Sequence, residues 1–240
     1  MSAIIDKKVV IFMYLALIGD IINSKQILER ETFQQSFQQL MTELSDVYGE
    51  ELISPFTITA GDEFQALLKP SKKVFQIIDH IQLALKPVNV RFGLGTGNII
   101  TSINLNESIG ADGPAYWHAR SAINHIHDKN DYGTVQVAIC LDDEDQNLEL
   151  TLNSLISAGD FIKSKWTTNH FQMLEHLILQ DNYQEQFQHQ KLAQLENIEP
   201  SALTKRLKAS GLKIYLRTRT QAADLLVKSC TQTKGGSYDF

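Results

Sequence analysis

The spacing of hydrophobic residues in the first two thirds of the chain predicts alternating strands and helices. A continuous apolar run from Val9 to Ile18 is typical of a central strand covered on both faces, and it ends at Gly19-Asp20. Apolar residues at helical spacing then predict one helix that starts near Ser24. They predict a second helix that Pro70-Ser71 opens and Pro87 stops.

Between these two helices, the stretch ITAGDEFQALL predicts a hairpin. Apolar and polar residues alternate on both sides of Gly61-Asp62-Glu63, so two adjacent acids lie at the tip. A strand over Val88–Ile99, a helix from about Pro114 and a strand over Thr134–Leu141 follow. The next residues, DDEDQN, are interpreted as a solvated turn. This order predicts an α/β sandwich with a mixed sheet and helices packed on it.

After Trp166 the pattern is helical only. A helix is expected behind a Thr cap in TTNHFQMLEHLILQ, followed by a short helix through Leu195, a turn, and a helix over Pro200–Ala209 that Ser210-Gly211 ends. Two helices joined by a short turn form a helix-turn-helix pattern. We therefore expect an α/β domain over residues 1–165, a small all-α helix-turn-helix module over 166–228, and a disordered tail over 229–240.

Charge is distributed unevenly over the 240 residues, of which 43% are apolar. The net charge of −6 argues against a protein that coats nucleic acid generally. Residues 184–220, however, hold seven Lys or Arg against three acids, an excess of +4 that leaves −10 for the remainder. This contrast indicates a basic module on an acidic body.

The cysteines and the first apolar run bear on the compartment. Cys140 and Cys230 are too few for a disulfide framework or a zinc site. The run from Val9 to Gly19 is shorter than the roughly 20 residues that span a bilayer, and no cleavage site of small residues follows it. The protein is expected to be cytoplasmic, without a membrane partner.

Two carboxylates stand at the ends of different predicted elements. Asp20 ends the first strand and Asp62 tops the hairpin, so both would project at the same edge of the sheet. Paired carboxylates suit Mg²⁺ or Mn²⁺, and two such ions can clamp the oxygens of a phosphoryl transfer. Backbone N–H groups at the next helix start would bind phosphate, with Asn23, Ser24 and Lys25 as side-chain contacts. The alternative is that each Asp is a cap or a solvated acid.

The second helix of the helix-turn-helix pattern carries the residues expected to contact DNA. Long cations there can reach phosphates and short polar side chains can approach base edges. The expected set is Ser201, Thr204, Lys205, Arg206 and Lys208, with Arg217 and Arg219 as further backbone contacts. A helical docking or dimerisation bundle with a solvated cationic face is the alternative.

Four stretches of the sequence resemble the SatD family of bacterial proteins: MYLALIGDIINSKQ, TAGDEFQALL, RFGLGTGNIIT and GADGPAYWHARSAI. The resemblance covers nearly all of the chain from Met13. LIGDIINS is also similar to the metal-binding strand end of class III nucleotidyl cyclases, and AGDEFQALL to their second metal hairpin and to the GGDEF hairpin of diguanylate cyclases. These similarities imply a ferredoxin-like palm domain that binds a nucleotide and pairs as a homodimer.

The resemblance also implies roles for particular residues. Asp20 and Asp62 would hold two metal ions, with the Ile21 carbonyl as a further ligand. Glu63 would match the acidic residue of the GGDEF pattern, and Arg120 the arginine that cyclases use on transition-state charge. Gly61 at the hairpin tip and Tyr116, which could stack on a base, complete the expected nucleotide contacts.

The sequence departs from the cyclase pattern in three places. Tyr116 stands where class III cyclases have Asn, Ile58 where adenylyl cyclases have Lys, and Ala60 replaces the first Gly of GGDEF. The stretch GLGTG lacks the spacing of a dinucleotide fingerprint and is interpreted as a close approach of a strand to a ligand or to neighbouring backbone.

These observations leave three functional hypotheses. The leading one is a DNA-binding transcriptional regulator whose front domain binds a nucleoside triphosphate or related nucleotide with Mg²⁺. The second is an active nucleotidyl cyclase or related phosphotransferase. The third is an inactive scaffold for dimerisation.

Overall fold

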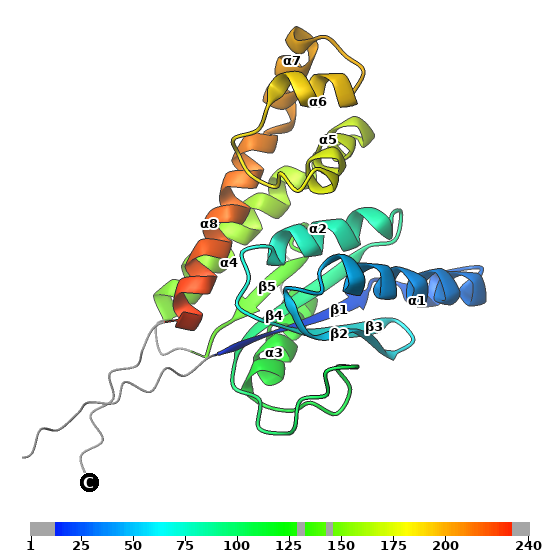
Figure 1. The fold of residues 1–240 in the computed structure, drawn as a ribbon, viewed down its shortest axis with the longest axis vertical. Helices are drawn as coiled ribbons and strands as arrows, with labels where there is room; N and C mark the ends of the chain where they lie inside the picture. Colours follow the sequence, from blue (N-terminus) through cyan, green and yellow to red (C-terminus); the bar gives the residue numbers. More distant parts are fainter. Residues whose placement is uncertain (1–12, 129–132, 143–145, 232–240) are drawn as a thin grey trace, which may run out of the picture.

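The computed structural model describes residues 13–128, 133–142 and 146–231, which form one five-stranded sheet with helices on both faces (Figure 1). The strand order is β2-β3-β1-β4-β5. The strands are β1 (Tyr14–Ile21), β2 (Leu52–Ala60), β3 (Glu63–Leu68), β4 (Val90–Gly97) and β5 (Val137–Cys140).

The connections between the strands give the sheet a ferredoxin-like topology. β1 is antiparallel to both β3 and β4, and β2 is antiparallel to β3. Helix α1 (Arg30–Val47) joins β1 to β2, and helix α2 (Val74–Ala84) joins β3 to β4. This β-α-β-β-α-β order confirms the expected palm-like α/β fold. Strand β5 extends it by pairing parallel to β4.

The two faces of the sheet are covered by different helices. Leu17 and Phe64 belong to the large hydrophobic core under α1 and α2. Ala16, Ile18 and Leu67 instead pack with helix α3 (Pro114–Asp128) on the opposite face. Neighbouring residues of a strand point to opposite faces, so the uninterrupted apolar run in β1 is explained by burial on both sides.

Glycines in β4 set the distance between the sheet and α3. A Cβ atom on Gly93 would lie 2.1 Å from the backbone oxygen of Ala119, and one on Gly95 would lie 2.1 Å from the backbone nitrogen of the same residue. The interpretation of GLGTG as a close approach is confirmed, and the neighbour is the α3 backbone. Arg120 is thereby held directly over the sheet.

Helix α4 (Gln146–Lys163) was not predicted, although it shields the edge strand β5. The N–H groups of Ile139 and Leu141 donate to the side chains of Asn153 (2.9 Å) and Glu149 (2.8 Å). Asp160 accepts the N–H of Val137 at 3.1 Å. Side chains therefore occupy the backbone donors of an edge that could otherwise pair with another strand. Leucine and isoleucine at 148, 152, 155 and 156 have the helical spacing that identifies α4.

The rest of the chain is helical, as the pattern after Trp166 predicts. Thr167 is the N-cap of α5 (Thr168–Leu179), and α6 (His189–Leu195) and α7 (Pro200–Ser210) are joined by a short turn. Gly211 ends α7 in the left-handed conformation, with φ of 63°. Within the described residues no helix is both long and apolar enough to cross a membrane.

Several expected boundaries are corrected. β1 begins at Tyr14, and the earlier part of the predicted strand, Val9–Phe12, lies outside the described residues. Helix α8 (Leu212–Thr231) was not predicted; Ser229 and Cys230 are buried in it, so residues 229–231 are not a disordered tail. Residues 232–240, and 143–145 of the predicted acidic turn, also lie outside the described residues.

A buried ionic network ties the helical segment to the sheet domain. Asp79 of α2 accepts hydrogen bonds from Lys163 of α4 (2.7 Å) and from the hydroxyls of Tyr183 (2.5 Å) and Tyr215 (2.6 Å). Asp160 of α4 pairs with Arg219 of α8, which lies alongside α4 (Figure 1). These bonds cross the expected division after residue 165, so the two parts share one buried interface.

We predict that Gly95→Ala lowers the free energy of unfolding by about 1–3 kcal/mol or more, because the added methyl group overlaps the α3 backbone. Gly49→Ala is the control, since its added Cβ meets no atom closer than 3.2 Å. Urea unfolding of both variants measures the difference. Equal stabilities would show that α3 is not seated on these glycines.

Candidate functional site

The register of β1 with its two neighbours brings charged groups together at one end of the sheet. Asp20 lies opposite Glu63 of β3 and opposite Arg91 of β4. Directly paired residues point to the same face, and this is the face that α3 covers. Asp62 adjoins Glu63 in the hairpin turn. We refer to Asp20, Asp62 and Glu63 as the acidic edge.

Asp20 is paired with an arginine that the sequence left unassigned. The Arg91 Nη2 atom lies 2.7 Å from Asp20 Oδ2, and both side chains are largely shielded from solvent. Burial raises the pKa of Asp20, Arg91 opposes this rise, and the charges of Asp62 and Glu63 add to it. Asp20 is therefore a carboxylate that a further cation would stabilise.

Glu63 is held by Arg120 of α3. The guanidinium donates to both carboxylate oxygens, with 2.7 Å between Arg120 Nη2 and Glu63 Oε1. These hydrogen bonds hold the pKa of Glu63 below its ordinary value. The structure thus brings together the two residues that the cyclase resemblance assigned to catalysis.

Asp62 is fixed by the segment that follows β1. The hydroxyl of Ser24 donates to Asp62 Oδ2 at 2.5 Å, and the backbone N–H of Ile21 donates to the Asp62 carbonyl at 3.0 Å. Gly61 takes the left-handed conformation in this turn, with φ of 53°, and its carbonyl accepts a bond from Gln34. Residues from β1, α1 and the hairpin therefore meet around Asp62.

The expected phosphate site at a helix start after Asp20 is corrected. Ser24–Gln26 form only a short 3-10 turn, and α1 begins at Arg30. Asn23, in the left-handed conformation with φ of 57°, and Lys25 are both exposed. Both residues follow Asp20 closely in the sequence. The N–H groups of the first turn of α1, however, begin at Arg30 and not directly after Asp20.

A cavity of about 390 Å³ adjoins the acidic edge on the α3 face. Its wall includes Gln65 of β3, the half-exposed Trp117 and Arg120. Tyr116 also lines it but is buried, and burial raises its pKa to about 12, so it remains a neutral phenol. The cavity offers aromatic and amide groups beside the charged cluster.

The acidic edge could supply part of the coordination of a metal ion whose other ligands come from a substrate. Among the residues that the structure describes, no three His, Cys, Asp or Glu side chains form a metal cluster. Asp20 and Asp62 each use one carboxylate oxygen, for Arg91 and Ser24 respectively, and the second oxygen makes no hydrogen bond within the described part of the chain. Mg²⁺ is commonly bound by one or two carboxylates plus substrate phosphates, which fits this donor set.

The residues expected to contact DNA have different environments. Arg219 is 1% exposed and pairs with Asp160, so its assignment as a DNA contact is wrong. Arg206 pairs with Glu196, and Arg217 with Glu185. The exposed members of the set that make no ion pair in the described structure are Ser201, Thr204, Lys205 and Lys208 of α7.

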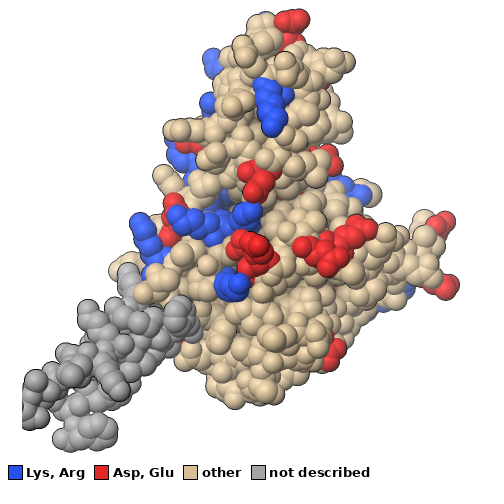
Figure 2. Space-filling model, in the orientation of Figure 1, with Lys and Arg blue, Asp and Glu red and all other residues tan. Residues whose placement is uncertain are grey.

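The surface around the helical segment is of mixed charge. Lys and Arg are interspersed with Asp and Glu on the face in Figure 2, without one continuous basic area. Three of the seven cations in residues 184–220 are ion-paired in the fold, namely Arg206, Arg217 and Arg219.

Comparisons with known proteins identify a family but no curated relative. The model of the SatD family matches residues 14–226, and no curated protein matches the chain. A crystal structure of the guanylyl cyclase Cya2 aligns with 47% of this chain and 70% of its own, at 15% identity and a TM-score of 0.36. A bacterial light-regulated adenylyl cyclase aligns with 52% and 74%, at 13% identity and a TM-score of 0.38. Likenesses this slight add nothing to the topology described above.

We predict opposite titrations for two acids of the edge. In the folded protein Asp20 should titrate above 3.8 and Glu63 below 4.5. The free energy of unfolding should then decrease as pH rises from 3.8 through the pKa of Asp20 in the folded protein, because ionised Asp20 is less favourable in the fold than in the unfolded chain. The Glu63–Arg120 pair contributes stability above pH 4.5 and loses it as pH falls through the lowered pKa.

Carboxyl-detected NMR titration measures both values. Arg91→Met should raise the pKa of Asp20 further and Arg120→Met should raise that of Glu63, because each arginine favours the ionised form. Arg217→Met, whose arginine pairs with Glu185, is the control and should change neither. An Asp20 that titrates below 3.8 would contradict the described environment.

Proposed function

The chain belongs to the SatD family, and on that premise we propose that its sheet domain binds a nucleoside triphosphate with Mg²⁺ or Mn²⁺ at the acidic edge. The observation that carries the proposal is the convergence of Asp20, Asp62 and Glu63 with Arg91 and Arg120 at one end of the sheet. Carboxylates for a cation and guanidinium groups for phosphates are thereby placed side by side.

Each residue has a defined part in this proposal. The free oxygens of Asp20 and Asp62 would hold one or two metal ions, with the Ile21 carbonyl as a further ligand. A bound metal would neutralise triphosphate charge. Arg91 and Arg120 would turn from their carboxylate partners to phosphate oxygens, and Ser24 keeps Asp62 in place. The base would enter the adjoining cavity between Gln65 and Trp117.

Catalysis at the same site is the alternative that the geometry favours most. Attack of a 3′-hydroxyl on the α-phosphate needs carboxylates that hold the metal ions and a cationic side chain that stabilises the negative charge of the transition state. Arg120 lies beside the acidic edge and could be that cation. The buried phenol of Tyr116, in the position of the cyclase Asn, counts against an ordinary cyclase reaction. Binding is therefore our first proposal and turnover the second.

A second copy of the chain would complete the site. Ile100, Leu105, Ile109 and Trp117 are 48–70% exposed around the start of α3, close in sequence to the cavity wall. We propose that these exposed apolar side chains contact a partner in a homodimer. Sedimentation velocity tests it, since Leu105→Asp should shift a dimer to monomer, and a wild-type monomer would refute it.

The exposed face of α7 supports DNA binding as a further proposal. Helix α7 lies at the end of the molecule far from the sheet (Figure 1). Its residues Ser201, Thr204, Lys205 and Lys208 are exposed. The protein would then act in the cytoplasm as a regulator whose nucleotide state alters its DNA affinity. Unchanged affinity on adding nucleotide at fixed salt would refute that coupling.

We predict that isothermal titration detects binding of at least one of ATP, GTP, CTP and UTP in the presence of Mg²⁺ or Mn²⁺. Asp20→Asn and Asp62→Asn should weaken it about tenfold or more, because each removes a charged metal ligand. Asp46→Asn, an exposed acid on α1, is the control and should bind like wild type.

Mass spectrometry of the same mixtures separates binding from turnover. A cyclic or linked nucleotide made by wild type and lost in Asp20→Asn would make the protein an enzyme. Intact nucleotides with metal-dependent binding would make it a sensor. Absence of any metal-dependent binding would contradict the proposed site.

We predict for the DNA-binding proposal that Lys205→Gln with Lys208→Gln weakens binding to a duplex of random sequence. The slope of log K against log salt is negative, and its magnitude should decrease by about two, roughly one for each lost phosphate contact. Lys165→Gln, an exposed lysine outside α7, is the control. Fluorescence anisotropy across a salt series measures the slopes, and an unchanged slope would remove α7 from the DNA interface.

A further inference from the structure

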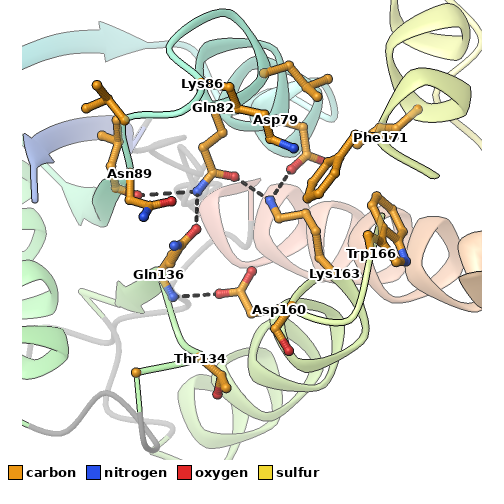
Figure 3. Close-up of a pocket in the computed structure, with 16 residues that line it drawn as sticks. Asp79, Gln82, Lys86, Asn89, Thr134, Gln136, Asp160, Lys163, Trp166 and Phe171 are labelled. Atoms are coloured by element: carbon orange, nitrogen blue, oxygen red, sulfur yellow. Dashed lines mark hydrogen bonds and ion pairs between the residues drawn. The ribbon is translucent and has the colours of Figure 1, made fainter. Parts of the chain in front are cut away.

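A second cavity lies at the junction between the sheet and the helical segment, away from the acidic edge. It has a volume of about 230 Å³ and is bounded by the end of α2, the start of β4, the end of α4 and the start of α5 (Figure 3). Drug-sized ligands occupy cavities of roughly 300–1,000 Å³. This cavity therefore suits a molecule smaller than a nucleotide.

The acids in the cavity wall are already neutralised by the protein. Asp79 is buried and is bonded to Lys163, Tyr183 and Tyr215. Asp160 pairs with Arg219 through one oxygen and accepts two backbone N–H groups through the other. Neither carboxylate has charge to spare for a bound cation.

Lys86 at the mouth of the cavity has no such partner. It is exposed and makes no ion pair within the described residues, and its ammonium group lies over the ring of Phe171. Figure 3 shows it beside Lys163, on the same side of the cavity. Desolvation first and the charge of Lys163 second lower its pKa to about 8, while Glu175 acts in the opposite sense. The positive charge of Lys86 is thus available to a ligand.

The remaining wall combines one more donor with apolar surface. Asn89 is exposed at the mouth, and in the described structure its side-chain amide makes no hydrogen bond. Leu83, Phe171 and Leu174 form an apolar side, with the buried Trp166 nearby. An ammonium and an amide next to aromatic and aliphatic groups match a carboxylate carried on an apolar body.

We propose that this junction cavity is a binding site for a small organic carboxylate. The carboxylate contacts Lys86 and Asn89, and the apolar body lies against Phe171 and Leu174. The site is independent of the proposed nucleotide site, so it stands or falls by its own test. It also lies where α2 and α4 are joined by the buried network, so a ligand would contact both parts of the molecule.

The test is an NMR titration of the full chain with four probes at constant ionic strength. Benzoate supplies both features, acetate the charge alone, benzyl alcohol the apolar body alone, and inorganic phosphate a different anion. We expect benzoate to bind saturably with amide shifts at Gln82, Asn89 and Gln136, and more tightly than the other three. Lys86→Met should weaken benzoate at least tenfold, because it keeps the side-chain stem and removes the charge.

Lys165→Met is the matched control, since Lys165 is also an exposed lysine over a phenylalanine ring, that of Phe161, but lies outside the cavity. It should bind benzoate like wild type. The proposal is overturned if benzoate does not saturate, if Lys86→Met binds it as tightly as Lys165→Met, or if phosphate binds more tightly than benzoate.

Discussion

Strand β1 lies between β3 and β4, and the registers of these two antiparallel ladders determine where three charged groups of the candidate site lie, those of Asp20, Glu63 and Arg91. Asp20 is opposite Glu63 on one side and Arg91 on the other. A shift of one residue in the register of β3 would turn Glu63 to the opposite face of the sheet, into the core beneath α1 and α2. The same shift in β4 would do this to Arg91. Burial of alternating residues such as Leu17 and Ile18 on the two faces fixes the register. The hydrophobic pattern of the strands therefore specifies the chemistry of the edge.

The helical segment depends on a different constraint, the buried charges between α2, α4 and α8. Burial alone would raise the pKa of Asp79, but Lys163 and Arg219, together with hydrogen bonds, hold it below its ordinary value. Two acids and two cations share this interface, so each buried charge has a counterion. Removing one partner of such a pair typically costs 3–5 kcal/mol. The network favours one arrangement of the helices on the sheet and shapes the junction cavity beside it.

Local patterns in the sequence predict the palm more completely than the helical segment. The apolar run of β1, the GDE turn and the glycines of β4 each identify an element, and two acids at strand ends identify the edge. Arg91 could not be assigned because its partner depends on strand register. Arg219 has the same local sequence character as a DNA-contacting arginine, and only the position of Asp160 on the unpredicted helix α4 reveals that it is buried. Local periodicity in a sequence does not show which residues pair when they lie far apart along the chain.

Paramagnetic NMR with Mn²⁺ tests most directly whether the acidic edge is a metal site. Adding Mn²⁺ with a nonhydrolysable triphosphate should broaden amide signals more strongly the closer they lie to the bound ion. We expect the amide signals of Ile21, Asp62 and Glu63 to broaden first, and Asp20→Asn to abolish the effect. Broadening centred on another group of acids, or equal broadening in the variant, would contradict it.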